Sequence, residues 1–259
     1  MPDDPPAVTV VNEHGASPIV LLCEHAANFI PARYGNLGLP PAELQRHIAY
    51  DIGAAAVARL LAQRLDAALA LAGYSRLLID CNRPPEAPGL IPARSEATDI
   101  PGNRNLSAEQ RAERDRLFFA PFRDRVAALL DARLAAGRPT VLIGMHSFTP
   151  LFRGVRRPWQ VGVLYLRAHR LAAALLDGLR TDAALLIGVN EPYCVTLAGD
   201  YTVPWVGEPR GIATALFEVR QDLIADDAGA AAWAGRLAGV LAPVAADPDA
   251  VTGLARAAT

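Results

Sequence analysis

The stretch IVLLCEHAANFIP, residues 19–31, begins as an apolar run and then changes abruptly to Glu24 and His25. Residues 140–148, TVLIGMHSF, repeat this arrangement and place His146 near the end of a second apolar run. Short apolar runs rich in leucine and β-branched residues are typical of strands that are buried on both faces of a sheet. The sequence therefore predicts two buried strands that each end near a histidine.

Other short apolar runs extend this pattern along the chain. They predict strands over residues 75–80 (SRLLID), 161–166 (VGVLYL), 184–190 (ALLIGVN) and 214–220 (TALFEVR). Helical patterns lie between them, over residues 40–73, 106–137, 169–180 and 221–246. This alternation is typical of an α/β fold, so we expect a three-layer α/β/α sandwich around a mostly parallel or mixed sheet. No repeat or linker divides the chain, and we interpret residues 1–259 as a single domain.

Two of the predicted helices carry boundary signals. The helix over residues 40–73 opens on prolines and closes at Gly73, a residue type that commonly ends helices. In the next helix, Ser107 stands three residues before Gln110, the spacing of a capping box. Pro121 lies inside that helix and predicts a kink or a break.

The composition limits the class of partner. The 259 residues carry a formal net charge of −2, which gives no support for a nucleic acid or an anionic membrane as partner. The three cysteines are widely spaced without a CxxC pair, as expected in a reducing compartment. The N-terminal MPDDPPAVTV differs from a signal peptide, and no apolar run approaches the ~18 residues of a membrane span. We therefore expect a cytoplasmic protein.

Polar residues follow the predicted strands at their carboxyl ends. Glu24 and His25 follow the first strand, Asn82 and Arg83 follow residues 75–80, and His146 lies at the end of residues 140–148. In open α/β sheets, ligands bind beyond the carboxyl ends of the strands. The sequence thus predicts that these side chains share one cavity.

Two histidines and a carboxylate around one cavity are the usual ligands of a hydrolytic zinc ion, which keeps a further position for water. Asp51, on the predicted helix after the first strand, can supply the carboxylate. His47 lies one turn earlier on the same helix face, and Glu24 also competes, although neighbours at a strand end tend to point apart. The residues leave Asp51, Glu24 and His47 open as the third ligand.

Glu218 interrupts the apolar run TALFEVR. A buried carboxylate without a partner costs several kcal/mol, so Glu218 must face a cavity, a cation or a metal site. A glutamate near a zinc site can act as the general base. P-loop, GxGxxG and GxSxG patterns are absent, which argues against nucleotide-binding and serine-hydrolase functions.

The motifs CEHAANFIP, HIAYDIGA, LIDCNRPP, DIPGNRNLS, GMHSFTP, NEPY, DYT and FEVRQDLI follow one another in this order. Together they resemble the N-formylglutamate amidohydrolase family over residues 18–225. The resemblance implies a fold like that of the zinc carboxypeptidases and aspartoacylase. It also implies hydrolysis of an N-acyl amino acid, the named substrate being N-formyl-L-glutamate of histidine degradation.

Carried over by residue, the resemblance makes His25 and His146 ligands of a Zn²⁺ ion, with Asp51 our choice for the third ligand, and it makes Glu218 the catalytic glutamate. Asn82 and Arg83 look like a pair that binds a substrate carboxylate, a task suited to the planar guanidinium. Arg104 and Arg220 are further candidates for binding the side-chain carboxylate of an acidic substrate.

The sequence is also compatible with two other functions. One is a metal- or ligand-binding protein without catalytic activity on the same fold, and the other is a zinc peptidase for small peptides. The partner expected for the preferred function is a small-molecule N-acyl amino acid. The oligomeric state is left open.

Overall fold

The computed structural model describes residues 4–247, so the ends of the expected single domain lie outside the described residues. Its centre is a seven-stranded sheet with the spatial order β1-β3-β2-β6-β11-β9-β10. These strands are β1 (Val8–Val11), β2 (Ile19–Cys23), β3 (Ala68–Ala72), β6 (Val141–Phe148), β9 (Val161–Leu164), β10 (Ile187–Val189) and β11 (Ala213–Arg220). Two hairpins are added by β4 (Arg94–Ser95) with β5 (Thr98–Asp99) and by β7 (Leu151–Phe152) with β8 (Val155–Arg156).

The sheet is mixed, with a parallel centre. Strands β3, β2, β6 and β11 are parallel to one another. Strand β1 is antiparallel to β3 at one side, and β9 is antiparallel to β11 at the other, with β10 parallel to β9. The parallel centre brings the carboxyl ends of β2, β6 and β11 to the same edge of the sheet.

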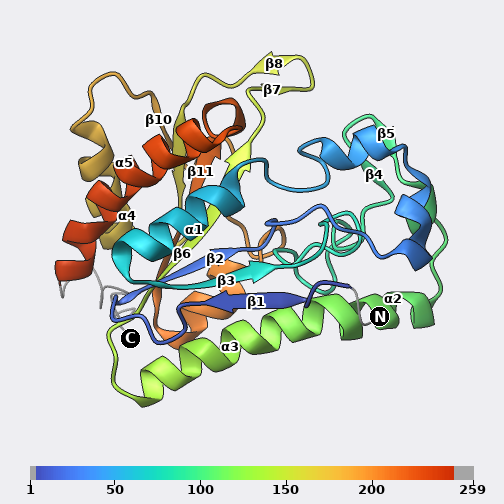
Figure 1. The fold of residues 1–259 in the computed structure, drawn as a ribbon, viewed down its shortest axis with the longest axis horizontal. Helices are drawn as coiled ribbons and strands as arrows, with labels where there is room; N and C mark the ends of the chain where they lie inside the picture. The colour runs from blue at the N-terminus through green and yellow to red at the C-terminus, as the bar shows by residue number, and fades with distance from the viewer. Residues whose placement is uncertain (1–3, 248–259) are drawn as a thin grey trace.

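Helices cover both faces of the sheet (Figure 1), as the three-layer expectation requires. Helices α1 (Ala54–Leu65), α4 (His169–Arg180) and α5 (Asp227–Ala246) pack on one face. On the other face lie α3 (Ala120–Ala135) and the preceding α2 (Ala108–Arg114). Short 3₁₀ helices span Ala32–Gly38, Pro41–Gln45, Pro101–Asn103, Glu208–Arg210 and Gln221–Leu223, and π-helical turns span Asp115–Phe119 and Thr202–Gly207.

Strand β2 shows why the sequence of a central strand is apolar at every position. Leu21 and Cys23 belong to the core under α1, α4 and α5, whereas Val20 and Leu22 belong to the core under α3. Because side chains alternate between the faces of a strand, both sets must be apolar when both faces are covered. The expectation of a buried strand ending at Glu24 and His25 is confirmed.

The second long helix begins as predicted and changes at its proline. Ser107 Oγ accepts a hydrogen bond from the Gln110 backbone N–H, and Gln110 Oε1 accepts one from the Ser107 N–H, which completes the capping box. Near Pro121 the helix does not break. It widens into the π-helical turn Asp115–Phe119, which joins α2 to α3.

Two predictions about local structure are wrong, and one strand was missed. The helix expected over residues 40–73 is instead a 3₁₀ turn, the helix α1 and then the strand β3, so Asp51 lies in the turn before α1 and not on a helix. Residues 75–80 form a buried turn rather than a strand. Its carbonyl groups are satisfied by side chains: Arg114 Nη1 donates to Leu78 O and Asn103 Nδ2 donates to Leu77 O. Strand β1 was not expected from the proline-rich start.

Helix α5 is long and apolar enough to cross a membrane by its length and composition alone, which the sequence had not indicated. In the fold, however, α5 is a core helix. Its residues Trp233, Leu237 and Leu241 are buried against α1 and α4. Its apolar character is therefore explained by packing within the domain.

Candidate active site

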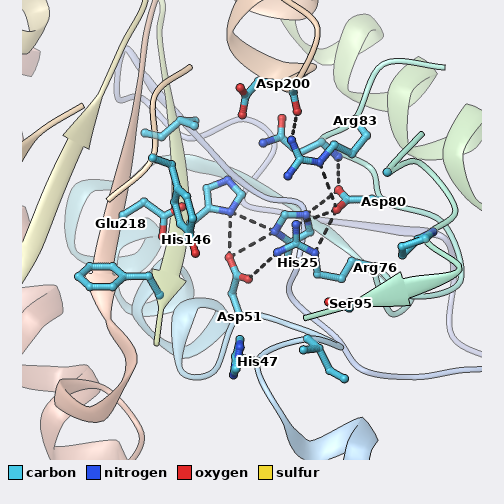
Figure 2. A pocket seen from close by; sticks show the side chains of 18 of the residues that line it. His25, His47, Asp51, Arg76, Asp80, Arg83, Ser95, His146, Asp200 and Glu218 are labelled. Atoms are coloured by element: carbon cyan, nitrogen blue, oxygen red, sulfur yellow. Dashed lines mark hydrogen bonds and ion pairs between the residues drawn. The ribbon is translucent and has the colours of Figure 1, made fainter. Parts of the chain in front are cut away.

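The polar residues predicted to converge do so at the carboxyl edge of the central strands (Figure 2). His25 follows β2, His146 lies in β6, and Glu218 lies opposite His146 in the register of β11 with β6. All three side chains are buried. They line a cavity of about 560 Å³ together with Asp51, Asn82 and Arg83.

Three side-chain atoms meet in this cavity. His25 Nδ1 lies 3.3 Å from Asp51 Oδ2, and His146 Nδ1 lies 2.9 Å from the same oxygen. The two Nδ1 atoms are 3.2 Å apart. A hydrogen bond from the backbone N–H of Asp51 to His25 O, 3.0 Å long, holds the turn before α1 against the end of β2.

The spacing of these three atoms fits a zinc ion. Ligand atoms about 2.0–2.1 Å from a tetrahedral zinc ion lie about 3.3–3.4 Å from one another. The observed separations of 2.9–3.3 Å come close to this value. Two ring nitrogens and a carboxylate oxygen directed at one point are a donor set that a cation can bind, so His25, Asp51 and His146 are a buried group able to hold a metal ion.

The other ring nitrogens of the two histidines face buried carboxylates. His25 Nε2 lies 2.7 Å from Asp80 Oδ1, and His146 Nε2 lies 3.2 Å from Glu24 Oε2. Thr202 Oγ1 donates a hydrogen bond to Glu24 Oε1. A carboxylate at the second nitrogen fixes the orientation of a metal-binding histidine and leaves the first nitrogen unprotonated for the metal.

Electrostatic effects follow from this burial. Burial and Arg76 act to lower the pKa of His25, but Asp80 and Asp51 outweigh them and leave it raised. Burial likewise acts to lower the pKa of His146, and Glu24 and Asp51 raise it well above its usual value. Without a cation, the carboxylates therefore favour protonated histidines, and a bound metal ion would take the place of those protons.

Glu218 differs from the other carboxylates. Its Oε2 is buried without a hydrogen-bond partner among residues 4–247. Burial raises the pKa of Glu218 to about 7, with His146 opposing this effect. Figure 2 shows Glu218 beside His146, at the wall of the same cavity. A carboxyl group with a pKa near neutrality can both accept and return a proton.

Arg83 and Asn82 also line the cavity. Arg83 Nη1 donates a hydrogen bond to Gly199 O, and Arg83 Nε lies 3.9 Å from Asp80 Oδ2. Asn82 Oδ1 accepts hydrogen bonds from the backbone N–H groups of Tyr201 and Thr202, so only its Nδ2 group is available to a ligand.

The remaining predicted residues lie elsewhere. Arg104 is an exposed residue 2.8 Å from Asp99, and Arg220 is 2.8 Å from Asp222, and neither lines the cavity. His47 does line it, but its Nε2 lies 3.2 Å from Glu96 Oε2 rather than near the three converging atoms. Among the alternatives for a third ligand, the geometry groups Asp51 with the histidines.

Sequence reasoning gave no role to several residues of the cavity wall, among them Arg76, Asp80 and Asp200. Arg76 donates to Asp51 Oδ1 at 3.3 Å and, through Nη2, to Asp80 Oδ2 at 2.8 Å, and so it orients both carboxylates. Asp80 ends the apolar run of residues 75–80, the same signal that identified His25 and His146, but it was passed over for Asn82 and Arg83. Asp200 is the first residue of the DYT motif, but it lies in a loop without a periodic signal and was given no role.

The chain is similar to proteins of known structure and matches a known family. A gene product of Agrobacterium tumefaciens, known from its crystal structure, is 39% identical to the chain with a TM-score of 0.91, over 95% of this chain and 97% of that one. The crystal structure of an N-formylglutamate amidohydrolase from Ralstonia eutropha JMP134 has a TM-score of 0.73 at 20% identity, over 93% and 97% of the two chains, and it supports the fold. None of the curated proteins matches the chain. The family model for N-formylglutamate amidohydrolase matches residues 17–225, most of the chain, and the chain therefore belongs to the N-formylglutamate amidohydrolase family.

Proposed function

We propose that this protein is a zinc-dependent amidohydrolase that cleaves the amide bond of an N-acyl amino acid, either N-formyl-L-glutamate or a related compound. The observation that carries the proposal is the buried group of His25, Asp51 and His146 in one cavity with Glu218. Three candidate ligand atoms close to tetrahedral spacing, beside a carboxyl group with a pKa of about 7, support a metal site with an adjacent proton carrier.

His25, Asp51 and His146 would hold the zinc ion, and Asp80, Glu24 and Arg76 would keep these ligands in place. A bound zinc ion supplies Lewis-acid chemistry, because it polarises a carbonyl group and makes a water molecule easier to deprotonate. The remaining steps belong to the residues of the chain.

Glu218 takes a proton from the attacking water, whose oxygen forms the new bond to the acyl carbon. The C–N bond then breaks, and Glu218 delivers the proton to the leaving nitrogen. The products are a carboxylic acid and a free amino acid, so atoms and charge balance without another reactant. Burial assists Glu218, since the raised pKa makes it a stronger base than an exposed glutamate.

Arg83 is proposed to bind the α-carboxylate of the substrate, and Asn82 Nδ2 to donate a hydrogen bond to it. A guanidinium suits this role because its donors match the two oxygens of a carboxylate. Membership of the family supports an N-acyl amino acid as the substrate class.

Metal analysis combined with a screen of N-acyl amino acids tests this function. We expect one zinc ion per chain by mass spectrometry of the metal and hydrolysis that stops on chelation and returns with zinc. A protein that binds zinc and hydrolyses none of the compounds would instead be a binding protein without catalytic activity. Faster cleavage of small peptides than of N-acyl amino acids would identify a peptidase.

A further inference from the structure

The charged groups of the cavity wall limit how many substrate carboxylates the site can accept. Of the described residues 4–247, only two arginines line the cavity, Arg76 and Arg83. Arg76 forms ion pairs with Asp51 at 3.3 Å and with Asp80 at 2.8 Å. Arg76 is therefore already paired with two carboxylates of the protein itself.

Arg83 is the more loosely paired of the two arginines in the described wall. Its closest carboxylate oxygen, on Asp80, is 3.9 Å away, which is long for a direct hydrogen bond. Within the described residues 4–247, its guanidinium donates a hydrogen bond through Nη1 to the neutral Gly199 O. Arg83 can therefore bind one substrate carboxylate in a bidentate way.

Asp200 adds a negative charge to the same region. It lines the cavity near Arg83, as Figure 2 shows, and no ion pair joins it to any residue between 4 and 247. Its Oδ2 accepts a hydrogen bond of 2.9 Å from the Thr196 backbone N–H. Burial raises the pKa of Asp200. The Thr196 hydrogen bond and the charge of Arg83 act in the opposite direction, but they do not offset the effect of burial.

Other arginines do not supply the missing charge. Arg104 and Arg220, the candidates that the sequence suggested for an acidic side chain, are paired at Asp99 and Asp222 outside the cavity. Arg157 does not line the cavity: its guanidinium lies 4.3 Å from the Phe152 ring centre and donates a hydrogen bond to the Tyr193 hydroxyl. The uncharged part of the wall includes Phe148, Phe152, Leu164 and Leu216.

We infer that the cavity selects N-acyl amino acids whose only carboxylate is the α-carboxylate, with an uncharged or basic side chain, and discriminates against acidic ones such as N-formyl-L-glutamate. This inference rests on the proposed function and deepens it. A dicarboxylate would meet one loosely paired guanidinium; its second carboxylate would find no second such group among the described lining residues, and Asp200 would repel it. A charge left without a partner in such a site is strongly unfavourable.

N-formyl-L-glutamine and N-formyl-L-glutamate provide the test, because they have the same acyl group and nearly the same shape but differ in charge. We expect the zinc-loaded enzyme to hydrolyse N-formyl-L-glutamine with a kcat/KM roughly tenfold or more higher, the scale of one unpaired charge. Calorimetry on the Glu218→Gln variant, in which hydrolysis is slow, should give a Kd ratio in the same direction.

The Asp200→Asn variant identifies the residue responsible. Asparagine keeps an oxygen for the Thr196 N–H and removes the negative charge. We expect kcat/KM for N-formyl-L-glutamate to increase, so that the ratio between the two substrates moves towards one. The Asp177→Asn variant is the matched control, because Asp177 is exposed on α4 and pairs with Arg180, and its ratio should equal that of the wild type.

The outcomes separate the two proposals. Equal or faster hydrolysis of N-formyl-L-glutamate by the wild type overturns the inference and leaves the proposed function intact. An unchanged ratio in a folded Asp200→Asn variant overturns the role of Asp200. Absence of hydrolysis of every N-formyl amino acid by the zinc-loaded protein refutes the proposed function, and the inference fails with it.

Discussion

Replacing Glu218 by glutamine removes the proposed general base and keeps the size of the side chain. In the metal-free protein, burial raises the pKa of Glu218 from 4.5 to about 7. A tenfold change in proton affinity corresponds to about 1.4 kcal/mol, so keeping the carboxylate ionised in the folded protein costs about 3 kcal/mol. Glutamine carries no charge and avoids this cost.

The effect on stability depends on pH in a defined direction. A carboxyl group with a raised pKa in the folded protein stabilises it below the unfolded pKa of about 4.5, and this contribution is lost as the pH rises through about 7. The Glu218→Gln variant does not lose stability in this way, because its side chain does not ionise. Its free energy of unfolding, relative to that of the wild type, should therefore rise by about 3 kcal/mol across this range.

Urea unfolding of both proteins in the presence of a chelator, at several pH values, measures this difference. Glu86→Gln, in which an exposed glutamate is changed in the same way, is the matched control for the substitution. In the zinc-loaded enzyme, kcat of Glu218→Gln should fall by ~10²-fold or more, the usual scale for general acid–base catalysis, with zinc content unchanged.

Two results would refute this reasoning. A stability difference that does not vary with pH would show that Glu218 ionises like an exposed carboxyl group. Wild-type turnover in the variant would exclude Glu218 as the base. Loss of zinc from the variant would instead make Glu218 a ligand.

The other predictions concern the metal and the substrate carboxylate. His25→Ala and His146→Ala should each lose stoichiometric zinc, and full retention of zinc in both variants would contradict the ligand assignment. Protonated imidazole rings cannot bind zinc, and folding raises the pKa values of both His25 and His146. Zinc affinity, measured by chelator competition, should therefore fall as the pH decreases through these raised pKa values. Asp80→Asn and Glu24→Gln should weaken zinc binding by ~10–100-fold, the usual effect of removing a carboxylate behind a ligand, and unchanged affinities would show that these carboxylates only fill space. Arg83→Ala should raise KM chiefly for substrates with a free α-carboxylate, with Arg83→Lys recovering part of the loss, whereas equal losses for the corresponding amides would make Arg83 structural.

Much of the site could be predicted because its signals are local. An apolar run that ends at a histidine, as at His25 and His146, indicates both a buried strand and a polar group at its carboxyl end. Glu218 was identified by the same logic, since a carboxylate inside an apolar strand needs a reason to be buried. These inferences use only neighbouring residues and the two-residue period of a strand.

Local signals failed where long-range contacts decided the conformation. Residues 68–72, ALALA, have a high helix propensity, and they form β3 because β1 and β2 pair with them on either side. Residues 75–80 are apolar because they are buried, but Arg114 and Asn103 satisfy their carbonyl groups in place of a neighbouring strand. An apolar run thus indicates burial without specifying the backbone conformation.

The sequence by itself predicted the α/β class, a mostly parallel or mixed central sheet, and His25, His146 and Glu218 at its carboxyl edge. Only the tertiary structure decided how those residues interact: Asp51 rather than Glu24 or His47 beside the two Nδ1 atoms, Asp80 and Glu24 at the other ring nitrogens, and Arg104 and Arg220 outside the cavity. The physical reason is that burial and strand periodicity are recorded in adjacent residues. Distances between side chains, and the pKa values that follow from them, depend on how segments far apart in the chain pack together.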